Sequence, residues 1–92
     1  MSLQLLHRKK EGIEILDVKG CLTLGQEDLD FRNELERLLQ SGSIRVALNF
    51  DDLRELDSAG LATLLFAREQ LRKAGGNLAI FNLHQSHIEL LV

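Results

Sequence analysis

The segment Asp57-Ser58-Ala59-Gly60-Leu61 places a carboxylate, a hydroxyl and a glycine where a strand should give way to a helix. An apolar run over residues 44–50 and a short acidic loop precede it, and the clearest helical pattern of the chain follows it as far as Gly75-Gly76. A hydroxyl at the start of a helix lies beside free backbone N–H groups, where the helix dipole favours negative charge. Ser58 can therefore either cap the helix or accept a phosphate group.

The composition is that of a small, acidic chain. Its 92 residues include 11 basic and 14 acidic side chains, giving a formal net charge of −3. This balance argues against a direct nucleic-acid partner, because such proteins usually present a basic face. The basic run His7-Arg8-Lys9-Lys10 lies where two strands should turn, and we interpret it as a solvated hairpin tip.

Cysteine use and hydropathy indicate where the protein works. The sole cysteine, Cys21, cannot form an internal disulfide, and we interpret it as a small, half-buried residue. No apolar run approaches the about 20 residues of a membrane span, and the N-terminus does not resemble a signal peptide. The sequence therefore predicts a cytoplasmic protein that does not enter a membrane.

Alternating and helical patterns predict the elements of the first half. Residues 3–8 and 13–18 should form an antiparallel hairpin that turns at Lys10-Glu11-Gly12. A helix should begin near Gln26 or Glu27 and end at Ser41-Gly42-Ser43. Its apolar stripe consists of Phe31, Leu35, Leu38 and Leu39.

The second half alternates strand and helix. Residues 44–50 are almost continuously apolar, which predicts a central strand covered on both faces. A helix should span residues 58–74, followed by a buried strand over 77–81 and a short third helix over 87–91, capped by Asn82 or Ser86. Because the links are short, the strands after the hairpin should be parallel. The core face of the helix over 58–74 should contain Leu61, Leu64, Leu65 and Leu71.

The opposite side of this helix is less polar than a solvated face. Ser58, Ala62 and Phe66 follow each other at intervals of four residues, and Ala59 and Thr63 extend the stripe. Small apolar residues with one aromatic suit the docking of another protein. Spacing alone leaves a simpler alternative, in which Ser58 only caps the helix and Phe66 is locally buried.

The acidic residues Asp51, Asp52 and Asp57 allow a second chemical hypothesis. Carboxylates after a buried strand are similar to the Mg²⁺-binding pocket of a receiver domain, where an aspartate is phosphorylated. That hypothesis requires an acidic pair after the first strand and a lysine after a later one. The first strand is instead followed by basic residues, and no lysine occurs after Lys73. We therefore rank this alternative last.

No residue pattern indicates an enzyme. His84 and His87 are three residues apart, but no third ligand is placed to complete a zinc site, and we expect both at the surface. Gly75-Gly76 follows a helix, whereas a phosphate-binding loop precedes one. The sequence predicts neither catalysis nor a cofactor or metal.

The stretch from Val46 to Phe81 resembles the STAS domain, the fold of the bacterial anti-sigma factor antagonists. The resemblance rests on Asn49-Phe50-Asp51, Asp57-Ser58-Ala59-Gly60-Leu61, Gly75-Gly76 and Leu78-Ala79-Ile80-Phe81; the hairpin, Gly20 and the helix from Glu27 also fit. It implies a single α/β domain over residues 1–92, with an antiparallel hairpin, then parallel β-α-β-α-β, and helices packed on the sheet. STAS domains usually add a last strand and helix, which this sequence lacks, so we expect either a longer parent protein or pairing with a second copy.

The resemblance also implies a function. In this family the serine after the aspartate is phosphorylated by a partner that is both anti-sigma factor and serine kinase, and phosphorylation ends binding. Carried over, Ser58 is the acceptor, while Asp57 and Gly60 shape the loop. A phosphatase and a homodimer mate are further candidate partners. The alternative within this fold is a regulatory or scaffold module of a transport or stress-signalling assembly. The expected partner-binding residues are Asp57, Ser58, Ala59, Gly60, Ala62, Thr63 and Phe66.

Overall fold

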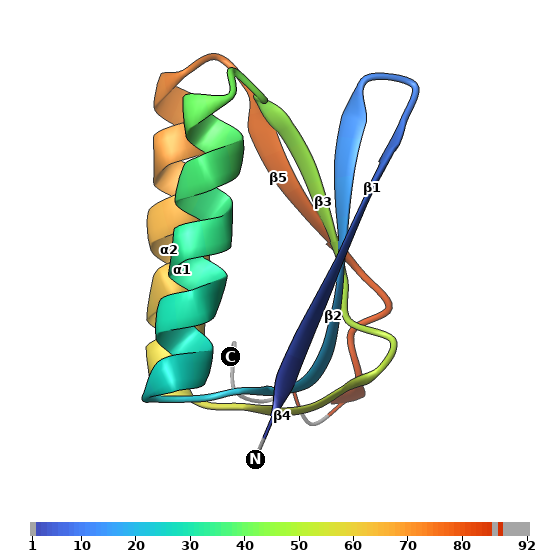
Figure 1. Cartoon of the computed structure of the whole chain (residues 1–92), viewed down its shortest axis with the longest axis vertical. Helices are drawn as coiled ribbons and strands as arrows, with labels where there is room; N and C mark the ends of the chain where they lie inside the picture. Colours follow the sequence, from blue (N-terminus) through green and yellow to red (C-terminus); the bar gives the residue numbers. More distant parts are fainter. Residues whose placement is uncertain (1, 86, 88–92) are drawn as a thin grey trace.

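The computed structural model describes residues 2–85 and residue 87 (Figure 1). The elements are β1 (Leu3–Lys10), β2 (Ile13–Leu22), α1 (Gln26–Gln40), β3 (Arg45–Asn49), β4 (Leu53–Leu56), α2 (Ser58–Lys73) and β5 (Asn77–Phe81). Ser86 and residues 88–92 lie outside the described residues, so the predicted third helix over 87–91 falls there except for His87. The described part confirms the predicted mixed α/β architecture.

The N-terminal hairpin is antiparallel, as predicted. Its register runs from Leu3 opposite Gly20 to Lys10 opposite Ile13. The two turn residues, Glu11 and Gly12, both have positive φ, 53° and 81°, as a type I′ turn requires. This turn matches the right-handed twist of the strands, and β2 continues beyond the predicted hairpin to Leu22.

The remaining strands are parallel, and β2 has two neighbours on the same side. The sheet order is β1-β2-β3-β5, and β4 pairs with the end of β2 that lies beyond β3. Residues 53–56 were predicted as loop; they form β4, which places Leu53 opposite Gly20 and Leu56 opposite Leu22. Four residues with two charges in the middle are too short to show a strand period. β4 carries the chain directly to the start of α2.

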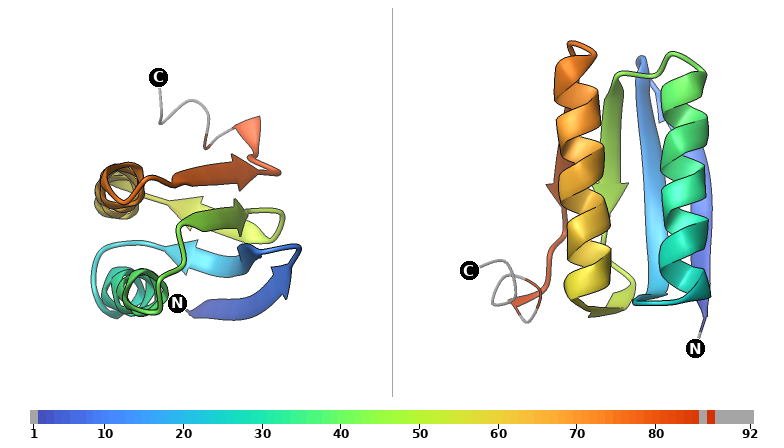
Figure 2. Two further views of the ribbon diagram at one scale, coloured as in Figure 1. Left: turned by 90° about the horizontal axis from the view of Figure 1, so that it is seen from above. Right: turned by 90° about the vertical axis from the view of Figure 1, so that its left-hand side faces the viewer.

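Both helices lie on one face of the sheet (Figures 1 and 2). In β3, Val46 and Leu48 point toward them and are buried, whereas Ala47 and Asn49 on the other face are only half-buried. β5 is likewise not the buried strand that was predicted: Phe81 is 39% exposed. The prediction of a strand covered on both faces is wrong because both crossovers lie on the same side of the sheet.

The core face of α1 was predicted correctly, whereas that of α2 was predicted only in part. Phe31, Leu35 and Leu38 of α1 are buried, as predicted. In α2 the buried residues are Gly60, Thr63, Leu64, Ala67 and Leu71. Leu65 is 55% exposed and therefore not part of the core face, contrary to the prediction. The core face of α2 is rotated toward its small residues, because a glycine and an alanine let the helix approach the sheet closely.

Candidate functional site

Asp57 holds the start of α2 against the loop that follows β2. It is the N-cap residue: its Oδ1 accepts a hydrogen bond from the N–H of Gly60 at 3.0 Å. Its Oδ2 accepts another from the N–H of Leu24 at 2.9 Å. These N–H donors, Leu24 first and then Gly60, lower the pKa of Asp57, and burial opposes them. One carboxylate therefore fixes two segments that are far apart in the sequence.

Ser58 is the first residue of α2, and its side chain is exposed. Because Asp57 provides the cap, the hydroxyl of Ser58 is not needed for capping, which removes the simpler of the two sequence interpretations. The hydroxyl makes no hydrogen bond with any residue in the described part of the chain. It therefore projects into solvent at the positive end of a helix dipole.

Gly60 brings this helix end against β2. A Cβ at this position would lie 2.5 Å from the backbone oxygen of Leu22 and 2.9 Å from side-chain carbons of Leu22 and Leu56. The first of these atoms belongs to the sheet and cannot rotate away. Only glycine allows α2 to begin so close to the end of β2, and this closeness puts Ser58 beside the loop that contains Leu24.

The predicted site residues separate into two sides of α2. Ser58 and Ala62 are exposed, and Phe66 is 48% exposed. Gly60 is buried, and Ala59 is half-buried at the margin. Thr63 was placed on the outer stripe, but it is only 1% exposed and faces inward, so that placement is wrong.

Two exposed apolar residues near the predicted site residues were not among them. Leu65, 55% exposed, takes the outer position that was assigned to Thr63. Leu24, in the loop before α1, is 78% exposed and lies beside the cap through its N–H bond to Asp57. Leu24 stands between Thr23 and Gly25, just after the end of β2, and nothing local in the sequence indicates that it lies near Ser58. We use the term α2 outer face for Ser58, Ala62, Leu65 and Phe66.

Thr63 links the two helices beneath this outer face. Its hydroxyl donates a hydrogen bond to Oδ1 of Asp28 at 2.5 Å and accepts one from Nη2 of Arg32 at 3.2 Å. The guanidinium carbon of Arg32 also lies 6.0 Å from the centroid of the Phe66 ring. Residues of α1 therefore contribute to the position of an aromatic ring on the α2 outer face.

We expect Thr63→Val to lower the free energy of unfolding by about 1–2 kcal/mol. Valine has nearly the shape of threonine, but it deprives Asp28 and Arg32 of their buried hydroxyl partner. Thr63→Ser, which keeps the hydroxyl, should cost less. Urea denaturation of both variants checks the difference. Equal stability of the valine variant and the unmodified chain would show that this network does not hold the helices together.

The stability that Asp57 provides should depend on pH. Its pKa is lowered from 3.8 in the folded state, so its contribution is present above that value and is lost as the pH falls through the lowered one. At pH 7 we expect Asp57→Ala to cost about 1 kcal/mol, and Asp57→Asn less because the amide oxygen still accepts a bond. Urea midpoints at pH 7 and pH 3 should show the gap between Asp57→Ala and the unmodified chain closing in acid; a gap that stays constant would contradict this assignment.

The acidic residues Asp51 and Asp52 do not form a metal pocket with Asp57. Asp51 and Asp52 form the exposed turn between β3 and β4, and Asp52 is 3.5 Å from Nζ of Lys19. Both carboxylate oxygens of Asp57 already accept N–H groups. Within residues 2–85 and 87, no group of three His, Cys, Asp or Glu side chains is placed to hold a metal ion. The geometry gives no support to a receiver-type phospho-aspartate site.

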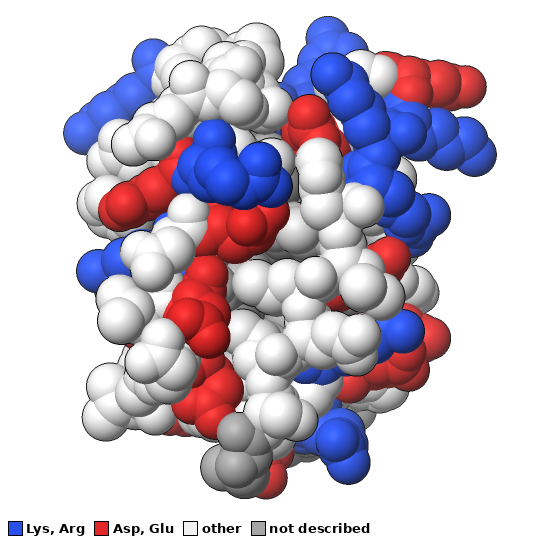
Figure 3. Space-filling view, in the orientation of Figure 1, with Lys and Arg blue, Asp and Glu red and all other residues white. Residues whose placement is uncertain are grey.

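Charge is distributed unevenly over the surface. Figure 3 shows Lys and Arg gathered at the hairpin tip and acidic side chains running down over α1. At the tip, Arg8 makes two hydrogen bonds to Asp17, at 2.9 and 3.0 Å, so part of the basic charge is already paired.

Neither described helix has the length and apolar character needed to cross a membrane.

Comparison with known proteins gives the family. Residues 4–92 match the family model of the STAS domain, and the chain therefore belongs to the STAS family. Comparison with curated protein sequences finds no match.

Solved structures share the fold at low sequence identity. The anti-sigma factor antagonist SpoIIAA in its unphosphorylated form superimposes with a TM-score of 0.78 at 18% identity, over 96% of this chain and 79% of that one. The Bacillus cell fate determinant SpoIIAA in its phosphorylated form gives 0.79 at 18% identity, over 98% and 80%. An antisigma-factor antagonist STAS domain from Rhodobacter sphaeroides gives 0.56 at 15% identity, over 87% and 86%.

Proposed function

We propose that this chain is an anti-sigma factor antagonist that binds an anti-sigma factor serine kinase, and that phosphorylation of Ser58 controls the binding. The observation that carries the proposal is the exposed hydroxyl of Ser58, the first residue of α2, which takes no part in capping the helix and belongs to its outer face. Membership of the STAS family supports it. So does the fold shared with SpoIIAA, an anti-sigma factor antagonist whose structure is known in unphosphorylated and phosphorylated forms.

The surface around Ser58 has the character of a docking site. Leu65 and Phe66 are 55% and 48% exposed on the α2 outer face, and Leu24 is 78% exposed beside its N-terminal end. Large apolar side chains exposed along one face of a helix and beside its start suit contact with a partner better than contact with water. The serine lies at the margin of this surface, where a partner that covers the leucines also covers the hydroxyl.

Phosphate at Ser58 would act mainly in the complex. It adds a charge of about −1.5 to −2 at neutral pH. In the free domain, the dipole of α2 favours it by about 1 kcal/mol and the group stays hydrated. In a complex, the same group must lose water against an apolar surface, and this cost weakens binding. Release of the partner therefore requires no refolding of the domain.

Phosphoprotein mapping tests the acceptor. We expect a cognate serine kinase to add one acid-stable phosphate, on the peptide that contains Ser58, and to leave Ser58→Ala unmodified. Ser41→Ala is the control, because Ser41 is an exposed serine just beyond the C-terminal end of α1. An acid-labile, Mg²⁺-dependent phosphate on aspartate would support the receiver-type hypothesis instead.

A pull-down from the native host, with and without phosphatase treatment, should identify the kinase by its loss from the phosphorylated sample.

Truncations on the α2 outer face should weaken kinase binding without unfolding the domain. We expect Leu65→Ala and Phe66→Ala each to cost about 1–3 kcal/mol of binding free energy, because both side chains would be buried by the partner. Leu6→Ala is the control, since Leu6 is 42% exposed on β1, away from this helix. Calorimetric titration measures the affinities. If Leu6→Ala weakens binding as much as the other two variants, the docking surface lies elsewhere.

A further inference from the structure

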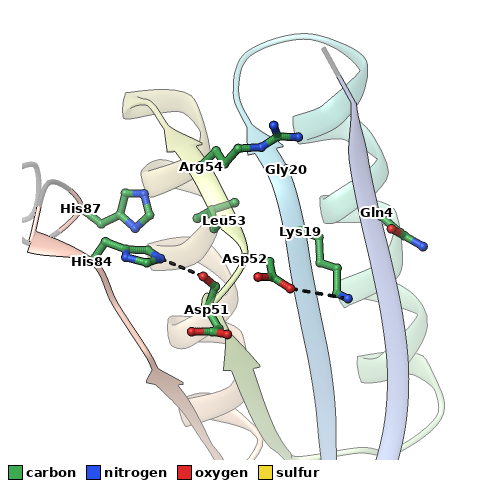
Figure 4. Close-up of a pocket in the computed structure, with 9 residues that line it drawn as sticks. All are labelled: Gln4, Lys19, Gly20, Asp51, Asp52, Leu53, Arg54, His84 and His87. Carbon is green, nitrogen blue, oxygen red and sulfur yellow. Dashed lines mark hydrogen bonds and ion pairs between the residues drawn. The ribbon is translucent and has the colours of Figure 1, made fainter.

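We propose that His84 and His87 form a pH-sensitive latch, which fastens the chain after β5 to the β3–β4 turn and to β4, and which mild acid opens. This inference is independent of the kinase partner. The two residues are close in sequence but lie against segments more than 30 positions earlier (Figure 4). Both histidines were predicted at the surface, and this prediction is wrong for His87, which is only 4% exposed.

The geometry of the pair defines the latch. Nε2 of His84 lies 2.8 Å from the backbone oxygen of Asp51, in the β3–β4 turn. The N–H of His87 donates to the backbone oxygen of His84 at 3.0 Å. The two rings meet edge to face, with centroids 5.4 Å apart and planes at 82°. His84 therefore binds the β3–β4 turn, and the ring of His87 packs against the ring of His84.

The buried ring of His87 fits its site only when it is neutral. Its Nδ1 has no hydrogen-bond partner among the described residues. A neutral imidazole carries a proton on only one of its two ring nitrogens, so Nδ1 can remain unprotonated in the closed state. Protonation at Nδ1 would bury a charged donor without an acceptor.

The surroundings do not stabilise the charged ring. The latch borders a hollow of about 690 Å³, whose charged lining groups are Lys19 from β2, Asp51 and Asp52 from the turn, and Arg54 from β4. Asp52 is paired with Lys19 at 3.5 Å, and His84 binds the main chain of Asp51, not its carboxylate. Burial is the main cause that lowers the pKa of His87, the charge of His84 adds to it, and the bond to Arg54 opposes both.

Neutral pH keeps the latch closed, and mild acid weakens it. Because the pKa of His87 is lowered from 6.5 in the closed state, the latch has its full strength above that value. As the pH falls below 6.5, the open state takes up the proton first and gains population. The segment that is released lies against β4, and β4 leads directly into Asp57-Ser58.

An NMR titration of the full chain from pH 7.5 to 5.0 tests the latch. We expect the His87 ring to titrate below pH 6.5, and the amide signals of Leu53 and Arg54 to move with the same midpoint. The amides of Gly20 and Leu53, which bond to the backbone oxygens of Asp52 and Phe50, should exchange about tenfold faster at pH 5 than in His87→Phe at the same pH.

Variants separate the latch from general acid sensitivity. His87→Phe keeps a buried ring without a titrating group and should show no transition at Leu53. His84→Gln should loosen the turn at all pH values and remove most of its pH dependence. His7→Gln removes the histidine that pairs with Glu14 at the distant hairpin and should leave the transition unchanged. A normal or raised pKa for His87, or the same transition in His87→Phe, would overturn the proposal; if the phenylalanine variant does not fold, the His84→Gln and His87 pKa measurements decide it.

Discussion

Replacing Ser58 with aspartate will weaken binding to the cognate kinase about 100-fold, a loss of about 3 kcal/mol, while Ser58→Ala will bind like the unmodified chain. The hydroxyl makes no hydrogen bond within the described residues, so alanine removes little. A carboxylate at the same point must lose water when a partner covers the α2 outer face, and no residue of that face carries a positive charge to compensate it. Full phosphorylation, with nearly twice the charge, should weaken binding further.

Isothermal titration of the two Ser58 variants with purified kinase measures this effect. Gln40→Glu is the control: it introduces a negative charge at an exposed side chain at the C-terminal end of α1, at the opposite end of the helix pair from the start of α2 (Figure 1), and we expect unchanged affinity. Thermal unfolding of all three variants verifies that each domain is folded. If Ser58→Asp and Ser58→Ala both bind like the unmodified chain, charge at this position does not control docking. That result would favour the scaffold alternative for this STAS domain.

Replacing Gly60 with alanine will lower the free energy of unfolding by about 2–3 kcal/mol and displace the start of α2. Alanine favours a helix over glycine by about 1 kcal/mol, but the new Cβ would stand 2.5 Å from the backbone oxygen of Leu22. The sheet cannot yield there, so the helix end must move outward. Movement breaks the 3.0 Å bond from the Gly60 N–H to Asp57 and carries Ser58 away from Leu24.

Urea denaturation measures the loss of stability, and kinase titration measures the loss of binding. The control is Ser58→Ala, which lies on the same helical turn, adds no atoms and should change stability by less than about 0.5 kcal/mol. We expect Gly60→Ala to weaken binding even at temperatures where the domain stays folded, because the site depends on the helix position. A Gly60→Ala variant as stable as the unmodified chain would mean that α2 does not rely on this close approach.

Local patterns were sufficient for most of the fold. The two-residue period and the turn at Glu11-Gly12 predicted the hairpin, because a type I′ turn needs a residue that accepts positive φ. The apolar face of α1 was correct because Phe31, Leu35 and Leu38 repeat at helical spacing. Gly75-Gly76 correctly predicted where α2 ends. These signals depend only on residues within one or two turns of each other.

The errors concern contacts between distant segments. Leu65 was assigned to the core and Thr63 to the surface because leucine is more apolar; the structure reverses them, since Thr63 satisfies its hydroxyl with Asp28 and Arg32 of α1. The open face of β3 was predicted to be covered because hydrophobicity does not tell on which side a crossover passes. Sequence patterns report what a residue prefers, whereas neighbours determine whether that preference can be met.

The sequence by itself determined that Asp57 and Ser58 stand where a helix begins, shortly after an apolar strand. The signals for this are local: the polar loop, the glycine and the helical period of the apolar residues. Only the tertiary structure decided that Asp57 also accepts the N–H of Leu24 and that Ser58 stays exposed. It also decided that Leu24, 33 positions before Asp57, borders the site. These features arise where the end of β2 meets the start of α2, and close packing between segments distant in sequence leaves no periodic trace in either of them.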